Sequence, residues 1–252
     1  MLKLIYKLIY KLIYKIINET YTAFILHRDM YFFKKDKDIR FNMIYKKFHQ
    51  KLADKTKNCS YDRHYLYHTA WAARILAKTK TNDHVDISSD LRFISSVSAF
   101  IPIKFFDYRP PIIELSNLEC EHADLTALKF ESNSINSLSC MHVIEHIGLG
   151  RYGDQIDSQG DIKAMKELTR VLACKGNLLF VVPIGHKSKI MFNAHRIYTK
   201  DMVIDMFEKL NLSLKEFVLI PESEKDGGLV LNPSNELLKK QVYGCGCFWF
   251  CK

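Results

Sequence analysis

The segment 134–185 constrains the fold more than any other part of this chain. An apolar run, SINSLSCMHVIEHI, is followed by a glycine-rich loop, an amphipathic segment (DIKAMKELTRVLACKG) and a second apolar run, NLLFVVPIG. This order of strand, loop, helix and strand is typical of a parallel α/β sheet. His142, Glu145 and His146 gather where the first run ends, and open α/β sheets bind ligands at that edge. The segment therefore predicts both a fold class and the position of a site.

Strands and helices also alternate through the rest of the region from Asp62 onward. Asp62 is the expected N-cap of one helix, and Thr199 is the expected N-cap of another that ends near Leu210. The expected strands are at 84–87, 103–107, a short one ending near 122–125, and 138–143, 178–182, 215–220 and 243–250. The fold class predicted is α/β: a Rossmann-like, doubly wound, mainly parallel, seven-stranded sheet.

All of the excess positive charge lies in the N-terminal quarter of the chain. Residues 1–57 contain 14 Lys and Arg against 5 Asp and Glu, whereas residues 58–252 contain 23 of each. This change predicts a helical, basic and apolar extension at 1–57 and an α/β domain at 58–252. Because the domain is neutral and carries no nucleic-acid-binding motif, we do not expect a nucleic acid partner.

The extension begins with the repeat Lys-Leu-Ile-Tyr, which starts at Lys3, Lys7 and Lys11. A helix with a row of lysines and a strongly apolar remainder is typical of segments that lie in a membrane interface. The repeat is too short and too regularly charged to span a bilayer. We expect peripheral membrane contact through residues 1–17; the alternatives are a repeat-expanded tail without function and a helix that covers the domain.

The seven cysteines are scattered and odd in number, which is typical of a reducing compartment and predicts a cytoplasmic protein, with the extension at the inner membrane face. The spacing of Cys245, Cys247 and Cys251 matches no common zinc site and favours a buried terminal strand. The HxxEH pattern of His142 and His146 resembles zinc motifs, but those motifs stand on a helix and this one continues a strand. We therefore expect no metal.

Three acids end predicted strands or lie just beyond them: Asp86, Asp107 and Asp124. In nucleotide-binding α/β folds an acid about 20 residues after the first loop binds the ribose hydroxyls, and Asp107 stands 21 residues after Asp86. Asp124 suits an adenine amino group. The alternative for each acid is a cap on its own loop. The first loop has Ser88 and Asp90 where such folds use glycine, so these side chains either crowd the site or contribute contacts.

Histidine suits a general base near neutral pH, so His142 or His146 is the candidate base and Glu145 would orient it. Each histidine has a simpler alternative as a hydrogen-bonding loop residue. The glycine-rich loop 148–160 is a candidate lid or substrate loop through Arg151 and Asp154, or else an ordinary surface connection. His195 and Arg196 should lie at the same edge, where Arg196 suits an anionic substrate group.

The motif MHVIEHI followed by AMKELTRVLACKGNLLFVVP resembles a segment of the class I S-adenosylmethionine-dependent methyltransferases. The resemblance covers about residues 62–220. In addition, DISSD, FxDYRPP, SCMHVIEHIGLGRYGD, VVPIG, FNAHRIY and YGCGCFWF are similar to an uncharacterised bacterial family of methyltransferase-like proteins, members of which are similar to proteins of surface-polysaccharide gene clusters.

The resemblance implies S-adenosylmethionine as the cofactor. It places the acid of the first cofactor motif at Asp86, the ribose-binding acid at Asp107, the adenine-contacting position at Asp124 and the strand-four position that faces the methyl group at His142. Together with the patterns described above, the predicted roles are cofactor binding for Asp86, Ser88, Asp107, Asp124 and Leu125, catalysis for His142, Glu145 and His146, and substrate binding for Arg151, Asp154, His195 and Arg196. The expected reaction is methyl transfer to an oxygen or nitrogen of a saccharide-related or other small acceptor. The alternatives are a non-catalytic binding or scaffold protein with this fold and a nucleotide-sugar-using enzyme of surface-polysaccharide synthesis.

Overall fold

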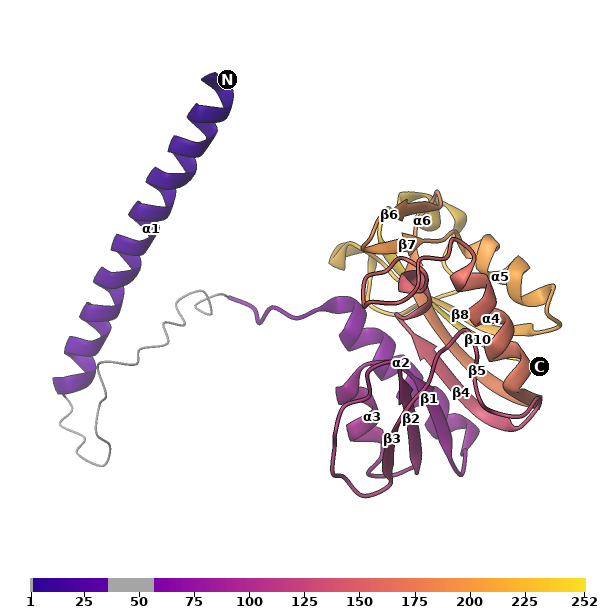
Figure 1. Cartoon of the computed structure of the whole chain (residues 1–252). Coiled ribbons are helices and arrows are strands. Elements are labelled where there is room, and N and C mark those ends of the chain that lie inside the picture. Colours follow the sequence, from indigo (N-terminus) through magenta and orange to yellow (C-terminus); the bar gives the residue numbers. More distant parts are fainter. Residues whose placement is uncertain (1, 36–56) are drawn as a thin grey trace. The chain divides into compact units, whose positions relative to one another are not determined.

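A computed structural model describes residues 2–35 and 57–252 of the chain (Figure 1). The chain forms two compact units, residues 1–61 and 62–252. The part of the predicted N-terminal extension at 36–56 lies outside the described residues.

The first unit contains one long helix, α1 (Leu2–Lys35). The helical extension predicted from the sequence is therefore confirmed for this range. Large apolar side chains on α1 are open to solvent, including Tyr6, which is 74% exposed, and Tyr10, which is 62% exposed. Among the residues described, no helix has both the length and the apolar character that crossing a membrane requires.

The second unit is built on a sheet of eight strands in the order β3-β2-β1-β4-β5-β10-β8-β9. The strands are β1 (His84–Ile87), β2 (Ile103–Asp107), β3 (Leu118–His122), β4 (Ile135–Met141), β5 (Leu172–Ile184), β8 (Ser213–Ile220), β9 (Val230–Leu231) and β10 (Gly244–Cys251). The strands from β3 to β5 are parallel, and β10 runs antiparallel between β5 and β8. The mainly parallel α/β fold is confirmed. The predicted count of seven strands is one too low, because the two-residue β9 has too little sequence pattern to be recognised.

Helices cover both faces of this sheet. They are α2 (Arg63–Thr79), α3 (Leu91–Val97), α4 (Gly160–Val171) and α5 (Lys200–Glu208). Side chains of α2 and α3 share one apolar cluster with one face of the sheet, and those of α4 and α5 share another with the opposite face. Alternate residues of β5 point to the two clusters, Phe180 to the second and Val181 to the first, as the two-residue period of a strand requires.

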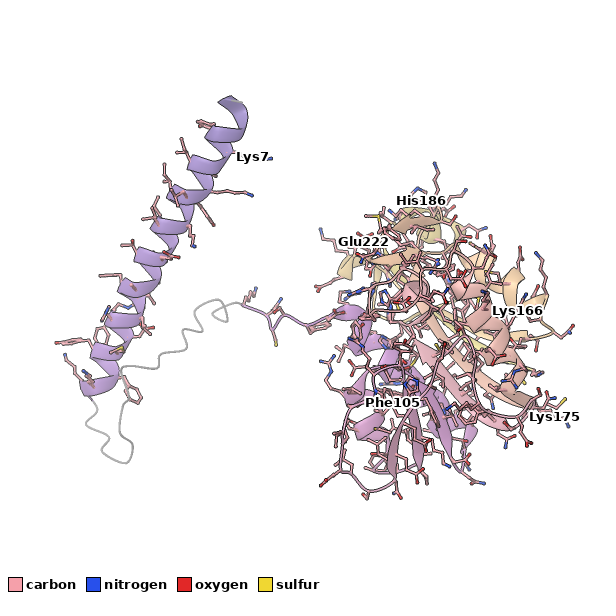
Figure 2. All side chains as sticks on the ribbon, viewed as in Figure 1. Lys7, Phe105, Lys166, Lys175, His186 and Glu222 are labelled. Carbon is pink, nitrogen blue, oxygen red and sulfur yellow. The ribbon has the colours of Figure 1, made fainter. Side chains whose placement is uncertain are left out.

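The N-caps predicted for two of these helices are present. The side chain of Asp62 accepts a hydrogen bond from Tyr65 N at the start of α2, and Thr199 accepts one from Met202 N at the start of α5. Smaller elements complete the unit: the hairpin β6 (Lys189–Met191) and β7 (His195–Ile197), α6 (Asn235–Lys240) and the 3-10 turns η3 (Ile144–His146) and η4 (Glu224–Asp226). Figure 2 shows Phe105 within the unit and Lys166, Lys175, His186 and Glu222 on its surface.

The topology determines where a ligand can bind. Strand order proceeds outward from β1 to β3 in one direction and from β4 onward in the other, so β1 and β4 flank a topological switch point. Loops that leave the carboxyl ends of β1 and β4 separate there and leave a crevice, which is where open α/β sheets bind ligands.

Candidate functional site

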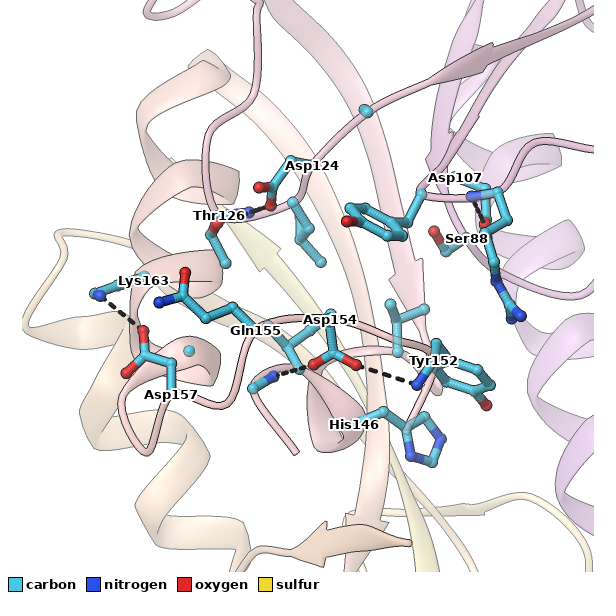
Figure 3. Close-up of a pocket in the computed structure, with 18 of the residues that line it drawn as sticks. Ser88, Asp107, Asp124, Thr126, His146, Tyr152, Asp154, Gln155, Asp157 and Lys163 are labelled. Atoms are coloured by element: carbon cyan, nitrogen blue, oxygen red, sulfur yellow. Dashed lines mark hydrogen bonds and ion pairs between the residues drawn. The ribbon is translucent and has the colours of Figure 1, made fainter. Parts of the chain in front are cut away.

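A cavity of about 430 Å³ lies at the carboxyl edge of the parallel strands (Figure 3). Cavities of this size hold small ligands and cofactors. The structure brings together at its wall seven of the residues that the sequence singled out: Ser88, Asp107, Asp124, Leu125, His142, His146 and Asp154.

Asp86 is fully buried behind the cavity and is part of a hydrogen-bonded network between β1 and β4. Its carboxylate accepts hydrogen bonds from Ser139 Oγ and, at 2.9 Å, from Ser89 N. Ser139 Oγ also lies 2.8 Å from His84 Nε2, which extends the network along β1. Burial raises the pKa of Asp86 to about 6, although the hydrogen bonds from Ser139 and Ser89 act in the opposite direction. Asp86 therefore positions the loop that follows β1 and does not itself line the cavity.

The glycine-free loop keeps the cavity open. Ser88 has a φ of +57°, in the left-handed region that glycine usually occupies at such a turn. Ser88 N donates to Phe106 O at 2.8 Å, so the loop is bonded to the end of β2. Asp90 caps α3 by accepting from Arg92 N and Phe93 N. The backbone at Ser88 thus adopts a conformation that favours glycine, although the loop contains no glycine.

Asp107 is the last residue of β2 and borders the cavity close to Ser88 (Figure 3). Its Oδ1 accepts a hydrogen bond from Arg109 N at 2.7 Å. Within the described part of the chain, Oδ2 of Asp107 has no hydrogen-bond partner. One oxygen is therefore fixed by the backbone, and the other is available to a ligand.

Asp124 and Leu125 follow β3. Asp124 Oδ1 accepts from Thr126 N at 2.8 Å and from Thr126 Oγ1 at 2.7 Å, so this acid caps its own loop, as the simpler interpretation of the sequence predicted. Both residues border the cavity, and Leu125, which is 5% exposed, also packs into the core. The two residues form one polar and one apolar portion of the wall.

His142 stands directly after β4 and also borders the cavity. Its Nδ1 lies 2.8 Å from Glu145 Oε1, and its Nε2 lies 3.4 Å from Cys245 Sγ. Glu145 is 1% exposed and does not reach the cavity wall. Both ring nitrogens of His142 are thus engaged by protein groups.

His146 borders the cavity, and both of its ring nitrogens have protein neighbours. Its Nδ1 lies 2.6 Å from Ala194 O and 3.1 Å from Arg151 Nη1, and its Nε2 lies 3.9 Å from Glu145 Oε1. The short contact with Ala194 O favours a proton on Nδ1 and a lone pair on Nε2. Burial lowers the pKa of His146, although Glu145 and the hydrogen bond to Ala194 act in the opposite direction, so the ring is neutral at physiological pH. His146 therefore has the protonation state that a general base requires.

Asp154 organises the glycine-rich loop. Its carboxylate accepts from Gly148 N at 2.8 Å, Gly150 N at 3.3 Å and Tyr152 N at 3.1 Å. Burial alone would raise the pKa of Asp154, but these backbone donors lower it. Gly148 has a φ of +77°, and a Cβ there would collide with the carbonyl oxygen of Asp157. The loop beside the cavity is thus an ordered turn held by one carboxylate.

Three residues predicted to bind substrate lie outside the cavity wall. Arg196 is 5% exposed, donates a hydrogen bond to Ile147 O at 2.6 Å and lies 3.6 Å from Asp161. Its guanidinium therefore makes buried contacts within the protein. Arg151 donates to Ala194 O, and the ring of His195 packs against Tyr243. The sequence placed all three near the correct edge but could not show which side chains turn inward.

The sequence did not single out several residues that the structure places at the cavity. The main ones are Tyr108, Arg109, Thr126, Tyr152, Gln155 and Lys163. Arg109 could have been recognised because it follows Asp107 by two residues. Lys163 lies on α4, pairs with Asp157 at 2.7 Å, and reaches the wall only through the packing of α4.

Comparison with known families and structures adds to this geometry. Residues 113–216, less than half of the chain, match the model of a family described as "Caenorhabditis protein of unknown function, DUF268". No curated protein matches the sequence. The matched family is uncharacterised, as expected, while the resemblance to a bacterial family remains a prediction.

Solved methyltransferases share the fold. One is a candidate methyltransferase from Bacillus halodurans, with a TM-score of 0.51, 15% identity, and coverage of 73% of this chain and 98% of that one. Another is the 1,6-didemethyltoxoflavin-N1-methyltransferase of Burkholderia thailandensis, solved with S-adenosylhomocysteine, with a TM-score of 0.51, 10% identity, and coverage of 73% and 78%. At these identities the similarity shows the fold alone. The protein therefore has the class I methyltransferase fold.

The raised pKa of Asp86 leads to a pH-dependent stability prediction. The folded pKa of about 6 exceeds the ordinary aspartate pKa of 3.8, so the stabilising contribution is present below pH 3.8 and is lost as the pH rises through 6. Asp86→Asn carries no charge, so we expect it to be more stable than wild type by up to about 3 kcal/mol at about pH 7.5. Urea unfolding should show that this advantage shrinks toward about pH 4.5.

The exposed Asp205→Asn serves as the control for loss of one acidic charge. An Asp86→Asn protein whose stability relative to wild type is independent of pH would show that Asp86 has an ordinary pKa.

Proposed function

We propose that the cavity binds S-adenosylmethionine and that the protein transfers the methyl group of this cofactor to an oxygen or nitrogen of a small acceptor. A saccharide-related molecule is the first candidate for this acceptor. The observation that carries this proposal is the available Oδ2 of Asp107 at the end of β2, beside a cavity at the switch point of a class I methyltransferase fold. A carboxylate at that place can accept hydrogen bonds from both hydroxyls of a ribose.

The charge of the cavity wall supports this cofactor over a nucleotide-sugar. Four carboxylates border the cavity, against two cationic side chains: Asp107, Asp124, Asp154 and Asp157, and Arg109 and Lys163. Asp157 is already paired with Lys163, and the guanidinium of Arg109 stacks on Tyr152. A sulfonium ligand with a positive centre suits this acidic wall, whereas the diphosphate of a nucleotide-sugar would be repelled.

In the proposed reaction the acceptor oxygen or nitrogen attacks the methyl carbon as the bond from that carbon to sulfur breaks. The electron pair of that bond stays on sulfur, and S-adenosylhomocysteine leaves. A hydroxyl acceptor also loses a proton, which His146 Nε2 takes, while Ala194 O holds the proton on Nδ1. His142 supports the site through Glu145 and does not receive this proton.

The open cavity favours an active site over a scaffold that has lost its ligand. A scaffold with a collapsed first loop would have no space beside Asp107, whereas Ser88 adopts the left-handed conformation that keeps this space open.

We also propose that α1 binds an anionic membrane surface through residues 1–17, which would place the protein at the cytoplasmic face. The support is the row of exposed lysines at Lys7, Lys11 and Lys15, together with exposed apolar side chains such as Ile9 and Ile13. Such helices bind by burying their apolar side and by attraction to anionic lipids.

The cofactor proposal predicts that the intact protein binds S-adenosylhomocysteine with micromolar affinity in calorimetric titration. Asp107→Asn keeps an oxygen for Arg109 N but weakens acceptance from the ribose, so affinity should fall roughly 10- to 100-fold. Asp205→Asn, which changes an exposed acid remote from the cavity wall, should bind as wild type does. Absence of binding at millimolar ligand would contradict the proposal and favour the scaffold; binding of a nucleotide-sugar instead would favour the second alternative.

The role of His146 predicts separate effects on binding and turnover. His146→Gln should retain affinity for S-adenosylhomocysteine and lower turnover of a hydroxyl acceptor found by screening by about 100-fold or more. The wild-type rate should rise with pH through a pKa below 6.5, because burial lowers the pKa of His146. Equal turnover in the variant and wild type would remove His146 from this role.

The membrane proposal predicts co-sedimentation of the full chain with anionic vesicles but not with neutral ones. Replacing Lys7, Lys11 and Lys15 by Gln should weaken binding by roughly 100-fold, since each lysine near such a surface contributes about 1 kcal/mol. The control replaces three exposed lysines of the second unit: Lys166, Lys175 and Lys187. Equal loss in both variants would contradict a specific role for α1.

A further inference from the structure

Three side chains that commonly ligate metals converge from distant parts of the second unit. His64 lies in the first turn of α2, His142 follows β4, and Cys245 lies on β10. One ligand atom from each lies within 4.8 Å of the other two. Because these elements are separated by about eighty residues or more along the chain, only the tertiary fold brings the three side chains together.

The spacing of the closest pair fits a tetrahedral zinc site. His142 Nε2 and Cys245 Sγ are 3.4 Å apart. Zinc bonds of about 2.0–2.1 Å to nitrogen and about 2.3 Å to sulfur, at a tetrahedral angle, place these two ligand atoms about 3.6 Å apart. These two ligand atoms therefore already lie at nearly the required separation, and the ligand atom of His64 lies within 4.8 Å of both.

Glu145 holds His142 in the orientation that metal binding requires. The 2.8 Å contact between Glu145 Oε1 and His142 Nδ1 places the ring proton on Nδ1 and leaves the lone pair of Nε2 directed at Cys245. Metal-binding histidines commonly donate their other ring N–H to a carboxylate, which fixes the ring and makes it a better ligand.

Buried polar atoms beside this cluster lack partners within the described residues. His68 Nδ1 lies 2.6 Å from His64 O, so its lone pair is on Nε2, and that buried atom has no hydrogen-bond partner. The ring of His68 lies 5.0 Å from that of His142. Glu145 Oε2 is also buried without a partner. Since nearly all buried polar groups are satisfied, two such atoms here indicate a missing ligand.

We propose that His64, His142 and Cys245 bind one divalent zinc-like ion, with water in the fourth position beside His68. On binding, the thiol proton of Cys245 and any proton on His142 Nε2 leave to solvent, so the thiolate and two imidazole lone pairs coordinate the metal. The metal fixes α2, the end of β4 and β10 to one point next to the proposed cofactor cavity. This inference does not depend on the identity of the cofactor.

A nucleophilic cysteine is the competing interpretation of the same contacts, because the side chain of Cys245 contacts His142, which in turn contacts Glu145. The Sγ of a nucleophile must meet its substrate, but Cys245 is 0% exposed and lies outside the cavity wall. A buried thiol of this kind suits metal coordination better than catalysis.

Cobalt provides the direct test because it reports both geometry and thiolate coordination. The full-length protein, stripped with a chelator and titrated with Co²⁺, should take up one equivalent tightly. It should then show a thiolate-to-cobalt charge-transfer band together with the visible bands of tetrahedral cobalt. Zn²⁺ should displace the cobalt and bleach both sets of bands.

Variants identify the ligands. Cys245→Ser should lose the charge-transfer band, His64→Ala should bind at least about 10-fold more weakly, and Glu145→Gln should lose about 10- to 100-fold in affinity because it holds a ligand. Cys140→Ala, a buried cysteine of β4 in the opposite apolar cluster, and Cys174→Ser, an exposed thiol, should behave as wild type.

Thermal unfolding keeps the proposal testable if a ligand variant folds poorly. Added Zn²⁺ should raise the melting temperature of the stripped wild-type protein, because a ligand that binds only the native state stabilises it. A wild-type protein without a charge-transfer band, or a band that persists in Cys245→Ser, would overturn the proposal.

Discussion

The hydrogen bond from Ser139 to Asp86 joins the two strands on which the site depends. It connects β1 to β4 at the switch point of the sheet and is continued by His84, which lies 2.8 Å from Ser139 Oγ and from Ser137 Oγ. On the other side, Asp86 accepts from Ser89 N, and Ser89 Oγ accepts from Met141 N. The network thus sets both the turn after β1 and the end of β4, from which Ser88 and His142 project.

Two histidines at the end of β4 have different chemical roles because their hydrogen bonds differ. His142 has Nδ1 against a carboxylate and Nε2 against a thiol, so its lone pair faces the interior. His146 has Nδ1 2.6 Å from Ala194 O and Nε2 3.9 Å from Glu145 Oε1. Both residues border the cavity, but only His142 also contacts the buried Cys245, so four residues separate two imidazoles with different partners.

Much of the fold was predictable because strand ends coincide with changes in polarity. The bounds of β1 and β2 agree with the prediction, since each apolar run is short and bounded by polar or turn residues. β4 begins three residues earlier than predicted, because Ser137 is buried through its hydrogen bond to His84 and interrupts the apolar pattern. The hairpin β6–β7 and the short α6 were not predicted, because neither has an apolar pattern long enough to identify it.

The site was only partly predictable, because the sequence shows which residues end a strand but not how their side chains pack. Acids at strand ends are visible in the sequence, so Asp107 and Asp124 could be placed at the correct edge. The direction of the Arg196 side chain on β7 depends on its contacts with Asp161 and Ile147, and no local pattern reports it. The contact between His142 and Cys245 joins residues 103 positions apart, which no spacing motif could reveal.

The central claim is that the crevice at the β1–β4 switch point binds S-adenosylmethionine. Photochemical cross-linking of the intact protein with radiolabelled S-adenosylmethionine, followed by peptide mapping, tests it most directly. Label should appear in peptides that contain residues 107–109, 123–126 or 142–163, and S-adenosylhomocysteine should compete for it. Label confined to other peptides, or label that S-adenosylhomocysteine does not reduce, would contradict the account.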